Sequence, residues 1–97
     1  MRLIRELRPV RLWRDRSGRA HADIPFVSVH SPTGIEWGYR GSGPTDLAIS
    51  IAVHFVERPS SDEIARVKEL VARVPIDARE HVIDARELER ALAGLID

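Results

Sequence analysis

The chain changes its residue pattern at one glycine-rich point, Gly41–Pro44, and this change limits the folds open to it. Before this point, short β-branched and aromatic runs alternate with turn residues, which is typical of strands. After it, apolar residues recur at helical spacing. Strands first and helices afterwards argue against alternating β-α-β units. We therefore predict an α+β fold, in which an N-terminal antiparallel sheet of about four strands is followed by three helices packed on it.

Two hairpins account for the four predicted strands. In the first, the run 10–14 is followed by the turn residues Asp15–Gly18, after which the chain can return as a second strand. In the second, the β-branched run 26–30 and the alternating run 35–39 flank a Ser-Pro-Thr-Gly turn. Pro25 lies between the hairpins, where a residue without a backbone N–H fits a strand start or an edge.

The segment 47–56 fits two interpretations. Its large apolar residues alternate as in a strand, but Asp46, Ser50 and His54 fall four apart, on one stripe of a helix. Pro44 favours the helix, because the first residue of a helix tolerates a missing N–H. We expect a central, mostly buried helix with a narrow polar stripe, and the strand remains the alternative.

Two further helices are predicted near the C-terminus. Ser60 and Glu63 form a capping box, in which each side chain accepts a hydrogen bond from a free backbone N–H at the helix start. One apolar face follows and ends before Pro75; its members are Ile64, Val67, Leu70, Val71 and Val74. Beyond it, we prefer a short extended segment at 81–83 and a helix over 85–95. One long helix over 77–96 is the alternative.

Length and composition indicate a single domain over 1–97, with 1–9 as a candidate flexible Arg-rich arm. The lack of cysteine excludes disulfides, zinc–thiolate sites and thiol nucleophiles, and it fits a reducing compartment. The charged N-terminus does not resemble a secretory signal, and no apolar run is long enough to span a membrane. We therefore expect a cytoplasmic protein without membrane association.

Arginine dominates the basic residues, since Lys68 is the only lysine, and Asn and Gln are absent. This bias is typical of a GC-rich genome or of a thermophile. The formal net charge is zero, yet residues 1–19 hold seven arginines against Glu6 and Asp15. Such a segment can bind phosphates or serve as the solvated edge of a strand. The candidate nucleic-acid contacts are Arg5, Arg8, Arg11, Arg14 and Arg16.

The stretch 30–48 reads His-Ser-Pro-Thr-Gly-Ile-Glu-Trp-Gly-Tyr-Arg-Gly-Ser-Gly-Pro-Thr-Asp-Leu-Ala. It resembles the signature of a family of small bacterial and phage proteins described only as a domain of unknown function. That family shows a Ser-Pro-x-Gly turn, then Glu-Trp-Gly-Tyr, Gly-Ser-Gly-Pro and a Leu/Ala-rich helix. The chain departs from the pattern mildly at Ile49–Ile51. The resemblance implies a fold and assigns no activity.

The glycine-rich corner is a candidate anion site. A glycine-rich loop that opens a helix directs free N–H groups at a ligand, and Arg40 beside Gly41, Ser42 and Gly43 would add positive charge. Neither a P-loop lysine nor a Gly-x-Gly-x-x-Gly pattern is present, and Asp46 in the first helical turn already supplies negative charge. We therefore favour a strand-to-helix corner in which the glycines take positive φ and Ser42 caps the helix or forms the turn.

Trp37 and Tyr39 lie two residues apart, so on a strand they would share one face and could stack on a base or a Pro-rich peptide. The chain has few aromatic residues, which favours core packing for at least one of them. The histidines show no metal-ligand spacing, and the many carboxylates indicate no acid–base pair. We therefore assign no catalytic residue, metal or cofactor.

Small size and the missing catalytic constellation favour a non-enzymatic protein-interaction or regulatory module that binds a protein partner or its own copy. The alternative is nucleic-acid binding through the Arg-rich N-terminus and the face predicted to carry Trp37, Tyr39 and Arg40. A third hypothesis is an enzyme that holds a phosphorylated small molecule at the Gly41–Gly43 corner.

Overall fold

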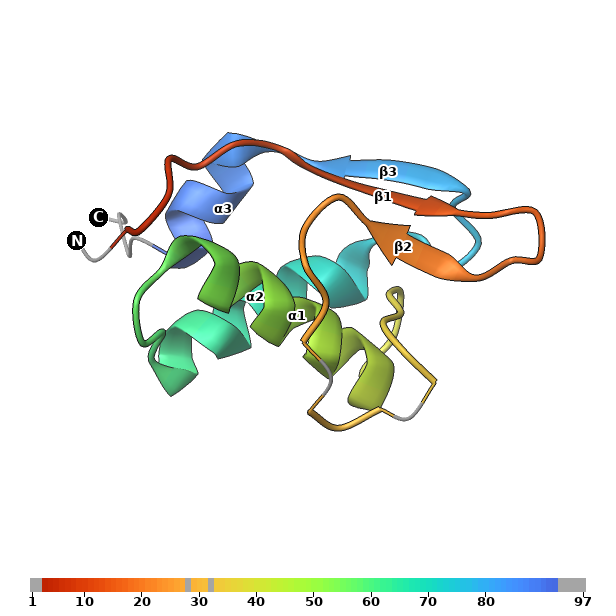
Figure 1. Ribbon diagram of the computed structural model, residues 1–97, viewed down its shortest axis with the longest axis horizontal. Coiled ribbons are helices and arrows are strands. Elements are labelled where there is room, and N and C mark those ends of the chain that lie inside the picture. Colours follow the sequence, from red (N-terminus) through yellow and green to blue (C-terminus); the bar gives the residue numbers. More distant parts are fainter. Residues whose placement is uncertain (1–2, 28, 32, 93–97) are drawn as a thin grey trace.

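The computed structural model describes residues 3–27, 29–31 and 33–92. Its elements are, in chain order, β1 (Val10–Arg14), β2 (Ala20–Ala22), α1 (Ser42–Phe55), α2 (Ser61–Arg73), β3 (Glu80–Ile83) and α3 (Ala85–Leu92). Figure 1 shows the strands on one side of the molecule, with α1 crossing in front of α2. The fold is α+β, as the sequence predicts.

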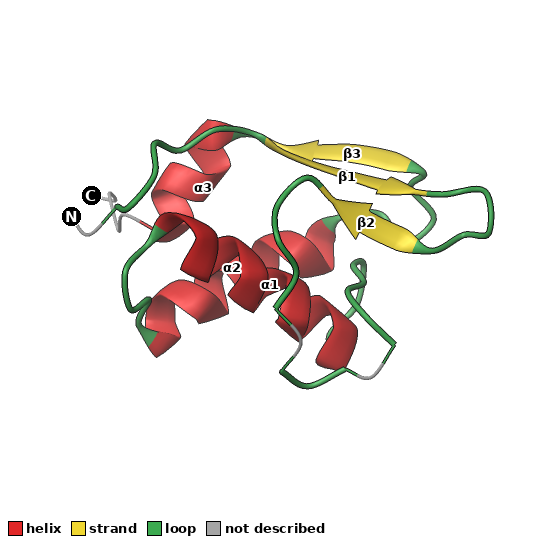
Figure 2. Cartoon of the chain, in the orientation of Figure 1, coloured by secondary structure: helices red, strands yellow, loops and turns green. Residues whose placement is uncertain are grey.

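The sheet is antiparallel throughout and has the order β2-β1-β3 (Figure 2). Arg14 N donates to Arg79 O over 3.0 Å, whereas Asp15 N donates to Arg19 O over 2.9 Å. Because bonded pairs alternate along an antiparallel strand, even-numbered residues of β1 bond to β3 and odd-numbered ones to β2. On β2, the N–H and C=O groups of Ala20 and Ala22 therefore point to the free edge of the sheet.

The strand count is three rather than four, because the predicted second hairpin does not form in the described residues. Side chains of α1 take up the N–H groups that its first strand would have used. Ser50 Oγ accepts from Val27 N over 2.9 Å. The carboxylate of Asp46 accepts from three further backbone groups, Val29 N, His30 N and Ser31 N. The third strand is β3 instead, which pairs with β1.

The predicted strand over 35–39 is interrupted at Gly38. This residue has a φ of 89°, which side-chain-bearing residues rarely adopt. A Cβ atom on Gly38 would stand 2.5 Å from Ile76 Cα, so the backbone also needs glycine there for space. Gly38 N donates to Val71 O, which fastens this bend to α2 rather than to a strand.

The ambiguous segment 47–56 is helical up to Phe55, and α1 is the central buried helix that the sequence favours. Leu47, Ile51 and Phe55 have no exposed surface. Pro44 is the third helical residue rather than the first, and the N-cap residue is Gly41, which has no side chain to cap with. Ser42 lies inside the helix, so its predicted capping role is wrong.

The two later helices agree with the sequence. Ser60 and Glu63 form the capping box of α2, with Ser60 N donating to Glu63 Oε1 over 2.8 Å and Glu63 N to Ser60 Oγ over 3.0 Å. The predicted apolar face of α2 contributes to the core. The preferred strand and helix at the C-terminus are confirmed as β3 and α3. Residues 93–95 of the predicted helix lie outside the described residues.

The helices cover only one face of the sheet. Val10, Leu12 and Ile83 point into the core, whereas Arg11 and Val82 are exposed on the other face. At the N-terminal end, Leu3 pairs with Val56 after α1, and Ile4 N donates to Phe55 O. In the described part of the chain, no helix combines the length and the apolar character needed to cross a membrane.

Candidate functional site

A hollow of about 330 Å³ opens beside the free edge of β2, between this strand, the segment 24–35 and α1. We call it the β2 hollow. Ala20 and Ala22 lie opposite Arg14 and Leu12 in the sheet, so their side chains share the core-facing side, and their small size leaves the space open. Apolar residues lie deepest in the hollow, namely Ile24, Ile35 and Leu47. Its volume is at the lower end of the range for small-molecule sites.

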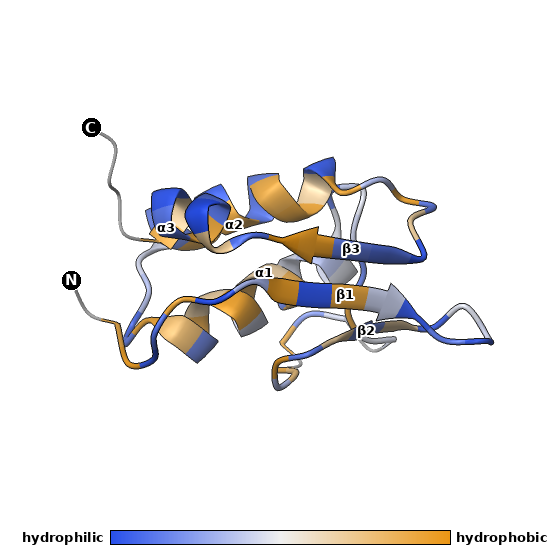
Figure 3. Cartoon of the chain, turned by 90° about the horizontal axis from the view of Figure 1, so that it is seen from above, coloured by the Kyte–Doolittle hydropathy of each residue, from blue (hydrophilic) through white to orange (hydrophobic). Residues whose placement is uncertain are grey.

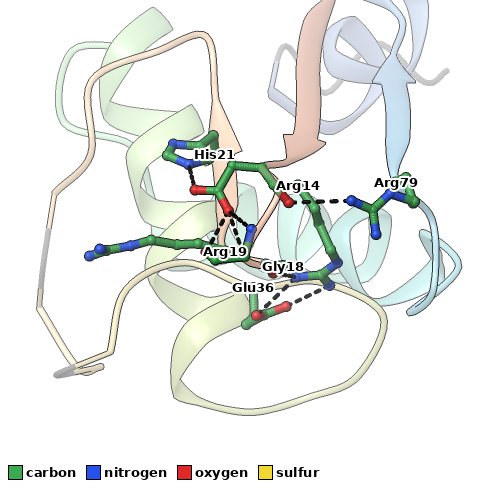
Figure 4. Close-up of polar contacts among 8 residues, drawn as sticks. Arg14, Gly18, Arg19, His21, Glu36 and Arg79 are labelled. Carbon is green, nitrogen blue, oxygen red and sulfur yellow. Dashed lines mark hydrogen bonds and ion pairs between the residues drawn. The ribbon is translucent and has the colours of Figure 1, made fainter.

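The turn between β1 and β2 forms one wall of the β2 hollow, and Asp15 organises it (Figure 4). Asp15 Oδ1 accepts from Ser17 Oγ over 2.6 Å, Ser17 N over 2.9 Å and Arg19 N over 3.0 Å. Asp15 Oδ2 lies 2.8 Å from His21 Nε2. The Ser17 hydroxyl and His21 stabilise the carboxylate and hold the pKa of Asp15 far below its usual range.

This cluster is not arranged for nucleophilic catalysis. In a catalytic triad the serine bonds to the histidine, and the histidine bonds to the aspartate. Here Ser17 and His21 both bond to the Asp15 carboxylate itself. The cluster therefore stabilises the turn that the sequence predicts at Asp15–Gly18.

Asp46 and Ser50 of α1 hold the chain between Phe26 and Thr33, two residues that line the opposite wall of the hollow. They do so through hydrogen bonds from the backbone N–H groups of Val27, Val29, His30 and Ser31. The Asp46 side chain has no exposed surface. Burial alone would raise the pKa of Asp46, but hydrogen bonds from the backbone N–H groups of Ser31, His30 and Val29 outweigh it and lower the pKa. Ser50 Oγ, which lines the hollow, also donates to Asp46 O over 2.7 Å. Two residues of the polar stripe predicted for this helix, Asp46 and Ser50, therefore hold the backbone of an earlier segment against α1.

Arg14 connects β1 to the segment that precedes α1. Its guanidinium forms a bidentate pair with Glu36, at 2.8 and 3.1 Å, and lies 4.3 Å from the centre of the Trp37 ring. It also donates to the carbonyl oxygen of Gly18 (Figure 4) and to that of Ile76. Only 13% of the Arg14 side chain is exposed. Arg14 therefore has a structural role, because it joins β1 to Glu36 before α1 and to the backbone at Ile76.

The other arginines proposed for nucleic-acid binding lie in different places. Arg8 pairs with Asp23 at 3.2 Å, and Arg5 Nη1 donates to His54 O over 2.7 Å. Arg11 lies 4.7 Å from the centre of the Trp13 ring, on the uncovered face of the sheet, and Arg16 is exposed in the turn. Arg5 and Arg8 both lie near His54, and two of the five, Arg8 and Arg14, already have carboxylate partners.

The glycine-rich corner brings together only part of its predicted site. Tyr39, Arg40 and Gly41 line a second hollow of about 380 Å³, next to Lys68 and Glu69 of α2. Arg40 forms a bidentate pair with Glu69, at 2.6 and 2.8 Å. Its charge is therefore already matched by a carboxylate.

The expected core packing of at least one aromatic residue is confirmed, because Trp37 has no exposed surface. Tyr39 is 43% exposed, so the two residues form no shared stacking face. The prediction of positive φ at the glycines of the corner is wrong. The positive φ belongs to Gly38, while Gly41 has an extended φ of 179°. Gly43 is needed for space instead, because a Cβ atom there would stand 2.9 Å from Glu36 Cβ. A Cβ atom on Gly41 would stand 2.7 Å from Cε2 of Tyr39, whose exposed ring can shift.

Sequence reasoning missed the β2 hollow because its residues come from β2, the segment 24–35 and α1. The local signal was the pair Asp46 and Ser50, two polar residues on a helix that is mostly buried. Among the described residues, no group of three His, Cys, Asp or Glu side chains could hold a metal ion.

Comparison with known proteins gives one match. A family model described as a family of unknown function (DUF6166) matches residues 5–94 of the chain. No curated protein and no solved structure matches it. The resemblance seen in the sequence is confirmed as far as a family of unknown function, and the bacterial and phage origin remains a prediction.

Proposed function

The chain belongs to the DUF6166 family, a family of unknown function, and from this premise we propose that it is a protein-interaction module. Its site is the free edge of β2, where it binds an extended segment of a partner protein. The observation that supports this proposal is the position of the edge, directly beside the β2 hollow.

The backbone of β2 supplies the main contacts. A peptide that adds to a sheet edge bonds to the N–H and C=O groups that point outward, and pockets beside the edge select alternate side chains. On β2 these outward groups belong to Ala20 and Ala22, both of which line the β2 hollow. One apolar side chain of the added segment then fills the hollow above Leu47.

The rim of the β2 hollow determines which segment fits. Phe26 and Val27 are 49% and 37% exposed and extend the apolar surface beyond the hollow. Arg19 lies on the rim, and Figure 4 shows its side chain extending away from the Asp15 cluster. In the described ranges, its guanidinium has neither an ion pair nor a hydrogen bond. An acidic residue next to the apolar one would pair with Arg19.

The opposite edge of the sheet is less suited to strand addition. On β3 the outward-pointing backbone groups belong to Glu80 and Val82. A charged side chain on an edge strand opposes pairing with another chain. The two edges therefore differ, and β2 is the one open to a partner strand.

Peptides selected from a random display library on the full-length protein provide the probe. Ala22→Pro removes an outward N–H that takes no part in the β1–β2 ladder, and proline is tolerated on edge strands. Ala22→Ser is the matched control, because it keeps the N–H and nearly the same size. We expect Ala22→Pro to raise Kd about tenfold and Ala22→Ser less than about threefold. Equal binding by both variants would refute the proposal.

Nucleic-acid binding through the Arg-rich N-terminal segment is the alternative. Its remaining support is the exposure of Arg16 and Arg19 at the tip of the first hairpin. Phosphate contacts are strongest at low salt, so a labelled single-stranded oligonucleotide titrated there is the suitable probe. Binding that is lost in Arg16→Gln and unaffected by Ala22→Pro would support this alternative.

A further inference from the structure

A third concave surface lies between α2 and α3. In Figure 3 these two helices lie at the edge of the molecule opposite β2. It is a groove of about 350 Å³, which we call the α2–α3 groove. Leu70 and Ala91 supply its apolar lining. Three arginines surround them, Arg66 and Arg73 from α2 and Arg90 from α3. The groove therefore combines an apolar base with a basic rim.

The two carboxylates of the α2–α3 groove are already engaged. Glu69 forms the bidentate pair with Arg40, and this bond lowers the pKa of Glu69. Glu87 caps α3, where Asp84 N donates to Glu87 Oε1 over 3.1 Å and Glu87 N donates to Asp84 Oδ1 over 2.8 Å. Neither glutamate forms an ion pair with Arg73 or Arg90 in the described residues, although Arg73 is close enough to Glu69 to contribute to the lowering of its pKa.

The arginines differ in what they do within the fold. Arg66 Nε donates to Ala91 O over 2.8 Å and so links α2 to α3. Arg73 and Arg90 are exposed. Within residues 3–27, 29–31 and 33–92, neither of them has an ion pair or a side-chain hydrogen bond. Their positive charge is available to a ligand.

We propose that the α2–α3 groove binds an acidic amphipathic helix of a partner protein. Two packed helices offer a groove to the side-chain ridge of a third, and the volume suits a few apolar side chains. The apolar stripe of the bound helix lies on Leu70 and Ala91, and its flanking carboxylates face Arg73 and Arg90. This surface is separate from the β2 hollow, so the inference does not rest on the function proposed above.

The probe is a synthetic helical peptide with leucines spaced three and four apart and glutamates on either side of them. A peptide with glutamine in place of every glutamate is its control. The double variant Arg73→Gln/Arg90→Gln tests the rim without touching the Arg66 link. Lys68→Gln and Arg86→Gln are matched controls, because they are exposed on the same helices but do not line the groove.

We expect isothermal titration to show binding of the acidic peptide, with a Kd that rises about 5- to 20-fold in the double variant. Each control variant should change Kd less than about twofold, and added salt should weaken binding to the wild type. The variant Arg73→Glu/Arg90→Glu should instead bind a peptide with lysine in place of glutamate. That charge reversal separates recognition from a general loss of structure.

Three results would overturn the proposal. The first is that the wild type does not bind the acidic peptide. The second is that the glutamine peptide binds as tightly as the acidic peptide, or that the double variant binds the acidic peptide with the Kd of the wild type. The third is that a single-stranded oligonucleotide binds more tightly than the peptide and depends on Arg73 and Arg90, which would make the groove a nucleic-acid site.

Discussion

Two aspartates bind backbone N–H groups around the β2 hollow, and they do so in different ways. Asp15 is partly exposed, and its bonds reach residues of its own turn and His21 on the adjoining strand. Asp46 is buried on α1, and its donors lie 15 to 17 residues earlier in the chain. Asp15 stabilises a turn that the local sequence already favours, whereas Asp46 determines where an irregular segment lies.

The difference between Asp15 and Asp46 affects the proposed binding site in the β2 hollow. Asp15, Arg19 and His21 line one wall of the hollow, whereas Phe26 lines the other and directly precedes the residues that Asp46 and Ser50 hold. Loss of the buried Asp46 carboxylate should therefore disturb the whole hollow. Loss of the partly exposed Asp15 carboxylate should disturb only the tip of the first hairpin.

The largest effect should follow Asp46→Ala. This change leaves the N–H groups of Val29, His30 and Ser31 without their acceptor, and we expect the free energy of unfolding to fall by about 2–4 kcal/mol. Chemical denaturation measures it, with the exposed Asp62→Ala as a surface control. A loss no larger than that of the control would show that Asp46 is not the anchor.

A smaller loss should follow Ser50→Ala. Ser50 Oγ accepts from Val27 N and donates to Asp46 O, so the substitution removes one acceptor and one donor. We expect the free energy of unfolding to fall by about 1 kcal/mol. Ser61→Ala, at an exposed serine of α2, is the control. If the two variants were equally stable, the bond to Val27 would contribute nothing.

Asp15→Ala should change global stability less than Ser50→Ala does, because its bonds are local and exposed. Amide hydrogen exchange should become faster at Ser17 and Arg19, whose N–H groups bond to Asp15 Oδ1. Exchange at Val29, His30 and Ser31 should stay as in the wild type. Faster exchange in both regions would mean that the two walls are coupled.

The smallest difference should appear in the pH dependence of stability. The folded pKa of Asp46 is lowered, so its contribution is complete above the unfolded pKa of about 3.9 and is lost as the pH falls through the folded value. The stability gap between the wild type and Asp46→Asn should therefore narrow below about pH 4. A gap that stays constant down to the acid transition would contradict the lowered pKa.

The sequence predicts the features that depend on neighbouring residues, but not those that depend on contacts between distant parts of the chain. The turn at Asp15–Gly18 and the capping box of Ser60 and Glu63 are local patterns, and both form as predicted. The predicted second hairpin does not form, because Asp46 and Ser50 on α1 accept hydrogen bonds from the N–H groups of its first strand. No local sequence pattern reveals these distant partners. The β2 hollow was missed for the same reason.

Residues near the glycine-rich corner show most clearly what cannot be predicted from the sequence alone. The sequence predicts positive φ at the glycines of the corner, but the positive φ occurs at Gly38, inside the predicted strand over 35–39. Gly38 meets Ile76, and Gly41 meets the ring of Tyr39. Arg14 looked like a phosphate contact until its pair with Glu36 was known. Such partners depend on tertiary packing rather than on residue type.

The most direct test of the central claim is amide hydrogen exchange at β2, measured with and without a display-selected peptide. Strand addition would bond the outward N–H groups of Ala20 and Ala22, while His21 N–H already takes part in the ladder with β1. We predict that the peptide slows exchange at Ala20 and Ala22 and leaves His21 nearly unchanged. Tight binding of the peptide with no added protection at Ala20 and Ala22 would contradict the account.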